Sequence, residues 1–130
     1  MQTRWIRPLF VVGGLYDGFL GFAFLFFPSA LFNTFDVTPP NHWGYIRFPA
    51  LLLILFGVMF FSIAADPVRR RELMLYGCGL KFAYCSTVFY YKIKFGIPDM
   101  WMPFAWADLA FLILFAVAWR QTGSVAVDQS

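Results

Sequence analysis

Three ionisable residues lie near the middle of three long apolar segments of this sequence. Asp17, Lys81 and Asp108 each stand about halfway along such a segment. A charge near the centre of a bilayer costs at least about 2.5–3.5 kcal/mol, so such residues persist where they pair with one another or serve a function. We therefore predict that Lys81 lies between the two carboxylates at a common depth. Tyr84, one helical turn after Lys81, is expected beside them.

This predicted cluster has three interpretations. It can be structural, fixing how the helices dock and in which register. It can line a pocket that binds a polar head group or moves protons. It can also belong to a surface that docks onto a larger membrane complex. Gly13 and Gly21, four residues before and after Asp17, favour an inward-facing carboxylate, because small residues let helices approach closely in lipid.

The other candidate residues lie outside the predicted cluster. His42, the only histidine, stands in a connection near Pro40, and we expect it at the outer membrane interface. Arg47 is expected to extend toward the outer head groups or to pair with an acid inside the bundle. Cys78 and Cys85 are two helical turns apart, about 10.5 Å, which is too far for a disulfide. We predict no catalytic residue, no metal site and no cofactor, because the sequence lacks the ligand sets and motifs that these need.

The composition places most of the chain in lipid. Hydrophobic residues make up 61% of the 130 residues and charged residues 13%, whereas soluble domains average about 45–50% and about 25%. The mean hydropathy is +0.68. The apolar runs are too long for strands, so we predict four transmembrane helices at about residues 8–27, 45–65, 73–91 and 100–119. We expect one all-α four-helix bundle over residues 1–130, with residues 121–130 as a short polar tail.

The connections between the predicted helices indicate their orientation. On the side of the N-terminus they carry six Lys and Arg residues, and on the other side three. Because these residues concentrate in cytoplasmic loops, we expect both termini in the cytoplasm and a multi-pass protein of the inner, cytoplasmic cell membrane. Residues 28–35 are expected to form a short interfacial helix, because Pro28 suits a first turn. We expect no nucleic-acid partner, because the basic run at residues 69–71 has no aromatic platform beside it.

Several short motifs accompany this four-span plan. The first predicted helix contains Gly-Gly-Leu-Tyr-Asp-Gly over residues 13–18, and the second contains Leu-Phe-Gly-Val over residues 55–58. The third contains Tyr-Gly-Cys-Gly-Leu-Lys over residues 76–81. Over its whole length the chain resembles the DoxX-like group of small bacterial membrane proteins with four helices. That group includes small subunits of quinone-linked oxidoreductases, so the resemblance implies a four-helix membrane fold and leaves several functions open.

The expected function follows from the short loops and from the lack of a catalytic constellation. We expect first a non-catalytic accessory or assembly subunit of a larger membrane complex, respiratory or redox in kind. The alternative is a binding protein or carrier for a lipophilic molecule, such as a quinone, a lipid or a sterol-like compound, at Asp17, Lys81 and Asp108. A membrane enzyme subunit of DoxX-like type comes third. The expected partners are membrane lipids, a larger complex or further copies of the chain, and a lipophilic ligand.

Overall fold

The computed structural model describes residues 3–129, with side chains described as far as residue 126. This part of the chain is all-α, 82% helical and without strands, as the sequence predicts. In chain order the elements are α1 (Ile6–Phe26), α2 (Pro28–Thr34), α3 (Gly44–Ala65), α4 (Arg71–Lys94), the short 3-10 helix η1 (Asp99–Trp101) and α5 (Met102–Gln129).

Three helical stretches are long and apolar enough to cross a membrane: Ile6–Phe26, Gly44–Ala65 and Asp99–Ala126. They match three of the four predicted spans and indicate a membrane protein. The other predicted span, residues 73–91, lies within α4. That helix has lower hydropathy, because it carries Lys81 at its centre and Lys92 and Lys94 in its last turn.

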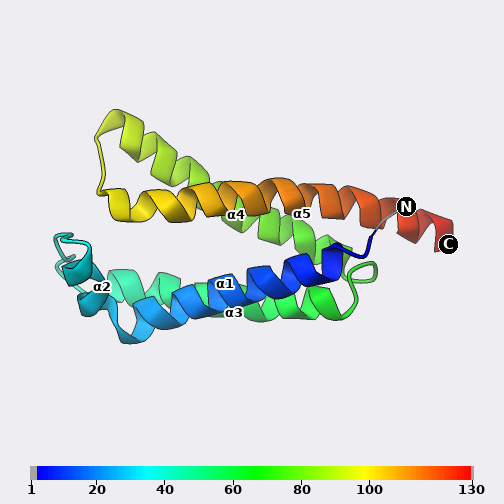
Figure 1. Ribbon diagram of the computed structural model, residues 1–130, viewed down its shortest axis with the longest axis horizontal. Helices are drawn as coiled ribbons and strands as arrows, with labels where there is room; N and C mark the ends of the chain where they lie inside the picture. The colour runs from blue at the N-terminus through cyan, green and yellow to red at the C-terminus, as the bar shows by residue number, and fades with distance from the viewer. Residues whose placement is uncertain (1–2, 130) are drawn as a thin grey trace.

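The four long helices associate as two pairs. Helix α1 packs along α3, and α4 packs along α5, while the contacts between the two pairs are fewer (Figure 1). Both chain termini lie at one end of the molecule, which we call the terminal end, and α2 lies at the opposite end (Figure 1). The arrangement leaves the space between the pairs to be filled by long side chains.

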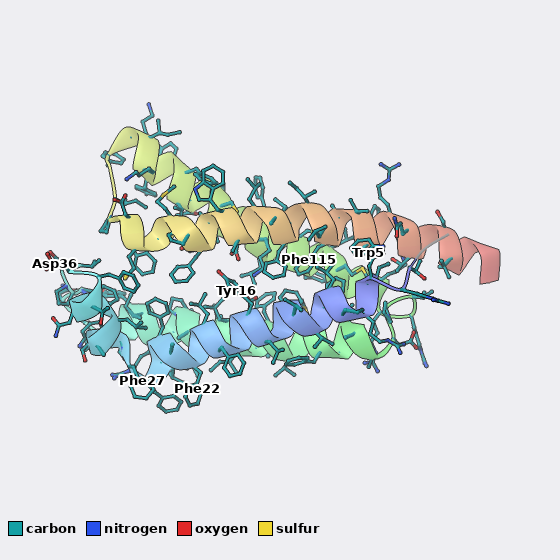
Figure 2. The ribbon with its side chains drawn as sticks, viewed as in Figure 1. Trp5, Tyr16, Phe22, Phe27, Asp36 and Phe115 are labelled. Carbon is teal, nitrogen blue, oxygen red and sulfur yellow. The ribbon has the colours of Figure 1, made fainter. Side chains whose placement is uncertain are left out.

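Aromatic side chains fill the space between the pairs toward the terminal end. The rings of Phe10 and Phe115 stack with centroids 4.6 Å apart, and Phe60 lies 5.0 Å from Phe115. All three side chains are fully buried, and Met74 of α4 joins them. This cluster therefore ties α1 and α3 to α4 and α5. Figure 2 shows Phe115 directed from α5 toward the other pair.

Helix α2 lies at the opposite end of the α1–α3 pair, and it confirms the short helix that the sequence predicts at residues 28–35. It begins with Pro28 at its first position. Phe32 is buried beneath it, edge-on to Trp43 at 5.2 Å and to Trp101 at 6.0 Å. The side chain of Phe32 thereby connects the start of α3 with the start of the last helix.

The last helix is longer than the sequence predicts, since α5 includes residues 121–129 of the expected polar tail. Two contacts from distant parts of the chain reach the helix where the expected tail begins. Arg71 Nη2 donates to the Trp119 carbonyl oxygen at 2.6 Å, and the guanidinium lies 4.6 Å from the Trp119 ring. Trp5 Nε1 donates to Gln121 Oε1 at 2.9 Å. These tertiary contacts fix the helix at the point where local polarity predicts its end.

Glycines allow α1 and α3 to approach closely. A Cβ atom on Gly14 would lie 3.0 Å from the Gly57 carbonyl oxygen. One on Gly21 would lie 2.6 Å from the Ala50 carbonyl oxygen and 2.9 Å from Ile54 Cγ1. Backbone atoms cannot move aside as a flexible side chain does, so this pair depends on small residues at its contact line.

We expect Gly21→Ala to destabilise the protein by about 1–3 kcal/mol, the usual cost of overpacking a close contact. The matched control is Gly18→Ala on the same helix, where an added Cβ meets no atom within 4 Å. Unfolding of both variants in detergent micelles, followed by circular dichroism, measures the difference. Equal stability of the two variants would contradict the assigned α1–α3 contact.

Candidate functional site

The structure brings Asp17, Lys81 and Asp108 together from three helices. Lys81 Nζ lies 2.7 Å from Asp17 Oδ1 and 3.0 Å from Asp108 Oδ1, and it donates a hydrogen bond to each. Asp17 and Lys81 are 0% exposed, and Asp108 is 6% exposed. We call these residues the central cluster. The ammonium thus lies between the two carboxylates, as the spacing in the sequence predicts.

Aromatic rings surround the ammonium on its remaining sides. Lys81 Nζ lies 5.1 Å from the centroid of Phe111, 5.3 Å from Tyr16 and 5.7 Å from Phe60. Ring faces at this distance attract a cation. Together with the carboxylates they enclose the ammonium of Lys81, which is why α4 can carry a buried charge at its centre.

Two polar atoms beside the central cluster are buried without a hydrogen-bond partner among the described residues. They are Asp17 Oδ2 and the hydroxyl oxygen of Tyr16. An unpaired buried polar group costs about 1–3 kcal/mol, so the site carries an energetic cost beside its ion pairs. Tyr16 was not expected at the site. Its only signal in the sequence is its position next to Asp17, and its placement depends on the Phe111 ring 5.4 Å away.

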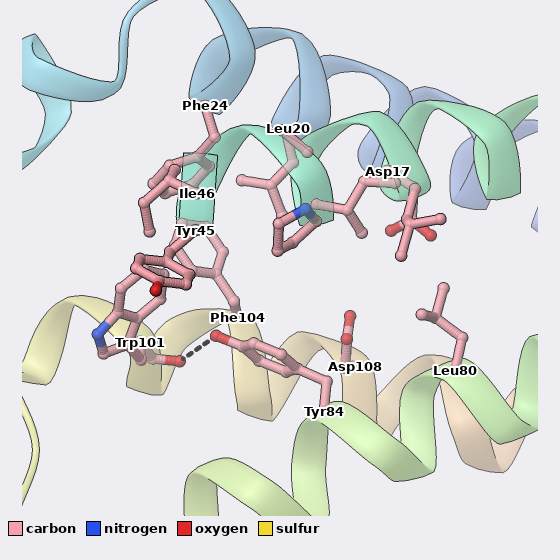
Figure 3. Close-up of a pocket in the computed structure, with 14 residues that line it drawn as sticks. Asp17, Leu20, Phe24, Tyr45, Ile46, Leu80, Tyr84, Trp101, Phe104 and Asp108 are labelled. Carbon is pink, nitrogen blue, oxygen red and sulfur yellow. Dashed lines mark hydrogen bonds between the residues drawn. The ribbon is translucent and has the colours of Figure 1, made fainter. Parts of the chain in front are cut away.

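An elongated cleft between the two helix pairs leads to the central cluster. Its volume is about 340 Å³, and residues of α1, α3, α4, η1 and α5 line it (Figure 3). Most of the lining is apolar: Leu20, Phe24, Tyr45, Ile46, Pro49, Ala50, Leu52, Leu53, Leu80, Trp101 and Phe104. Asp17 and Asp108 line the same cleft, whereas Lys81 does not. Of the two carboxylates only Asp108 is partly accessible, with 9% of its side chain exposed, whereas the side chain of Asp17 is 0% exposed.

Tyr84 lines the cleft but does not bond to the central cluster. Its hydroxyl donates to the Trp101 carbonyl oxygen at 3.0 Å, as the dashed line in Figure 3 shows. That bond joins α4 to the start of the last helix. The sequence predicts Tyr84 beside Lys81 as a member of the cluster. In the structure it shares the cleft lining with Asp17 and Asp108, but its hydroxyl bonds to Trp101 instead.

His42 and Arg47 lie apart from the central cluster. The Nδ1 atom of His42 accepts a hydrogen bond from the Gly44 backbone at 2.9 Å, which stabilises the start of α3. Arg47 is exposed, and its Nε donates to the Leu25 carbonyl oxygen at 3.2 Å, near the end of α1. It forms no ion pair with a described acid, so the expected alternative of an acid partner inside the bundle is not found. Both residues have local structural roles.

The arrangement can do two things chemically. It offers a hydrogen-bond acceptor at the end of an apolar cleft, and it holds an ammonium that is hydrogen-bonded to two carboxylates. Within residues 3–129, no group of three or more His, Cys, Asp or Glu side chains is placed to hold a metal ion. Comparisons of the chain with protein-family models, with curated proteins and with solved structures found no match.

Proposed function

We propose that this chain is a small membrane protein that binds a lipophilic molecule in the cleft between its helix pairs. The observation that carries the proposal is the cleft itself, apolar along its walls and closed by Asp17 and Asp108. Its volume of about 340 Å³ falls within the range of about 300–1,000 Å³ that is typical of small-molecule sites. Such sites combine apolar walls with a few polar groups that fix the orientation of the ligand.

The free acceptor selects the polar end of the ligand. Lys81 occupies Oδ1 of both carboxylates, and Asp108, the partly exposed one, has its Oδ2 without a hydrogen bond from a described residue. A ligand group that donates a hydrogen bond to Asp108 Oδ2 would satisfy this acceptor. The proposed ligand therefore has an apolar body and a hydroxyl or amine head, as in a sterol-like alcohol, a reduced quinone or a lipid.

The proposal includes α4 as a fourth membrane span, with both termini in the cytoplasm. Helix α4 has 24 residues, or about 36 Å, which is long enough to cross a hydrocarbon core of about 30 Å. Its central charge is fully buried and paired, so it does not face lipid. Six Lys and Arg residues at the terminal end against three at the other support the cytoplasmic side, and the four-helix plan is consistent with DoxX-like membership.

The test is native mass spectrometry of the protein extracted gently from its own membranes. We expect a chain that carries a defined small mass, and we expect Leu80→Trp to lose that mass because the indole fills the cleft. Leu75→Trp is the matched control, since Leu75 lies on the same helix, is 46% exposed and does not line the cleft. Equal loss or equal retention in the two variants would contradict binding in the cleft.

The same measurement tests the accessory-subunit function. A stoichiometric protein partner without a bound small molecule would favour a subunit of a larger complex over a binding protein. If Leu80→Trp loses both the partner and the small mass, the bound ligand would instead be required for assembly of that complex. An enzyme subunit would require a partner that supplies the missing catalytic groups.

A further inference from the structure

A second pocket lies at the terminal end, away from the cleft. Its volume is about 400 Å³, and it is formed by the start of α1 and the connection between α3 and α4. The charged residues that line it are Arg4, Arg7 and Asp66, and Thr3 adds a hydroxyl group. This pocket shares no residue with the cleft, so it is independent of the proposed function.

The positive charges of the two arginines in this pocket are not neutralised by a described acidic side chain. Neither Arg4 nor Arg7 forms an ion pair with a described side chain. Arg7 makes only a long contact of 3.5 Å from Nη2 to the Ala65 carbonyl oxygen. Asp66 Oδ1 instead accepts from the Arg69 backbone at 3.4 Å. The pocket thus holds two positive charges and one negative charge that do not neutralise each other directly.

Neighbouring arginines at the same end are already occupied by the protein. Arg70 Nη1 donates to the carbonyl oxygen of Ser62 at 2.7 Å and to its hydroxyl oxygen at 2.8 Å. Arg71 is bound to the Trp119 carbonyl oxygen. The basic residues of the terminal end therefore have different roles, since some fasten helices together while Arg4 and Arg7 remain available in a pocket.

We propose that this pocket binds the phosphodiester of an anionic phospholipid. Guanidinium groups bind phosphate oxygens through two parallel hydrogen bonds, and Arg4 and Arg7 both line this pocket. The pocket lies where α1 begins at Ile6, which is the level of head groups for a helix that starts to cross the bilayer. Asp66 in the same wall disfavours a second negative charge, so a diester with one charge fits better than a phosphomonoester.

The experiment uses the full chain in nanodiscs that contain equal parts of phosphatidylglycerol and phosphatidylcholine. Native mass spectrometry then counts the lipids that remain bound after release. We expect one phosphatidylglycerol to be retained in preference to phosphatidylcholine, and about a 30-fold loss of that retention in the double variant Arg4→Gln/Arg7→Gln. The control is Arg69→Gln/Arg120→Gln, which removes two exposed charges from the same end and leaves the pocket lining intact.

Three results would overturn this site. The first is equal retention of the two lipids, and the second is an equal loss in the pocket variant and its control, which would mean general surface attraction. The third is that soluble glycerol 3-phosphate displaces the lipid and occupies the pocket to the same extent, which would point to a free phosphate as the ligand. The Leu80→Trp protein is expected to retain the lipid like the parent, because that substitution lies in the cleft and not in this pocket.

Discussion

Lys81→Met is expected to destabilise the protein by about 3–5 kcal/mol, because it leaves Asp17 and Asp108 buried beside each other without a counter-charge. The methyl-thioether side chain fills much of the space, so the effect reports the lost charge more than a cavity. Titration of the micelle-bound protein with a denaturing detergent, followed by circular dichroism, measures the free energy of unfolding.

The chain offers a matched control on the same helix. Lys92 pairs with Asp99 at 2.8 Å, but these side chains are 38% and 90% exposed. Exposed ion pairs contribute little, because water screens the charges and the long side chains lose freedom on pairing. Lys92→Met is therefore expected to unfold like the parent. A Lys81→Met protein as stable as Lys92→Met would exclude the cluster as a stabilising element.

A variant in which all three residues of the central cluster are neutral distinguishes their effect on stability from their effect on ligand binding. Replacing a whole buried ion cluster by neutral groups is often tolerated, whereas removal of one partner is not. The triple variant Lys81→Met/Asp17→Asn/Asp108→Asn is thus expected to recover most of the stability lost in Lys81→Met. If the cluster also binds the ligand, the recovered protein is folded but retains no small mass. Retention of the ligand in this variant would reduce the cluster to a structural role.

The contact among Asp17, Lys81 and Asp108 could be predicted from sequence, because each residue stands about halfway along an apolar segment of similar length. Charges that are buried at the same height in neighbouring helices require one another. The same reasoning does not predict the cleft. The cleft exists because the two helix pairs touch at separate places: the rings around Phe115 at the terminal end, the central cluster, and Phe24 and Phe32 against Trp101 at the opposite end. This arrangement depends on the side-chain volumes of several helices.

Other misses also arise from contacts between distant residues. Tyr16 precedes Asp17, yet its ring lies beside Lys81 only because α1 faces α4 and α5 with that edge. Helix α5 continues past Trp119, where Arg71, 48 residues earlier in the chain, bonds to it. Local polarity indicates a tail there, and a contact between such distant residues cannot be inferred from that local pattern. The short helix α2 was predicted because its signals, Pro28 and an apolar face, are local.

Phe60→Ala is expected to be the most damaging substitution outside the central cluster. Phe60 is 0% exposed and lies 5.0 Å from the Phe115 ring and 6.0 Å from the Phe10 ring. Phe→Ala substitutions in cores cost about 3–5 kcal/mol, and we expect the lower part of that range because lipid weakens the hydrophobic share. The same detergent titration measures it, with Phe48→Ala as the control, since Phe48 lies on α3 and is 65% exposed.

Gly77 provides a second-site test of this contact. A Cβ atom on Gly77 would lie 2.7 Å from Phe60 Cε1, so Gly77→Ala alone is expected to be destabilising. In the Phe60→Ala protein that ring atom is gone, and the added methyl group enters the cavity while alanine favours the helix by up to about 1 kcal/mol. Gly77→Ala should therefore destabilise the parent and stabilise Phe60→Ala. Additive losses in the double variant would contradict direct packing of α3 on α4 at this point, and with it the arrangement that encloses Lys81.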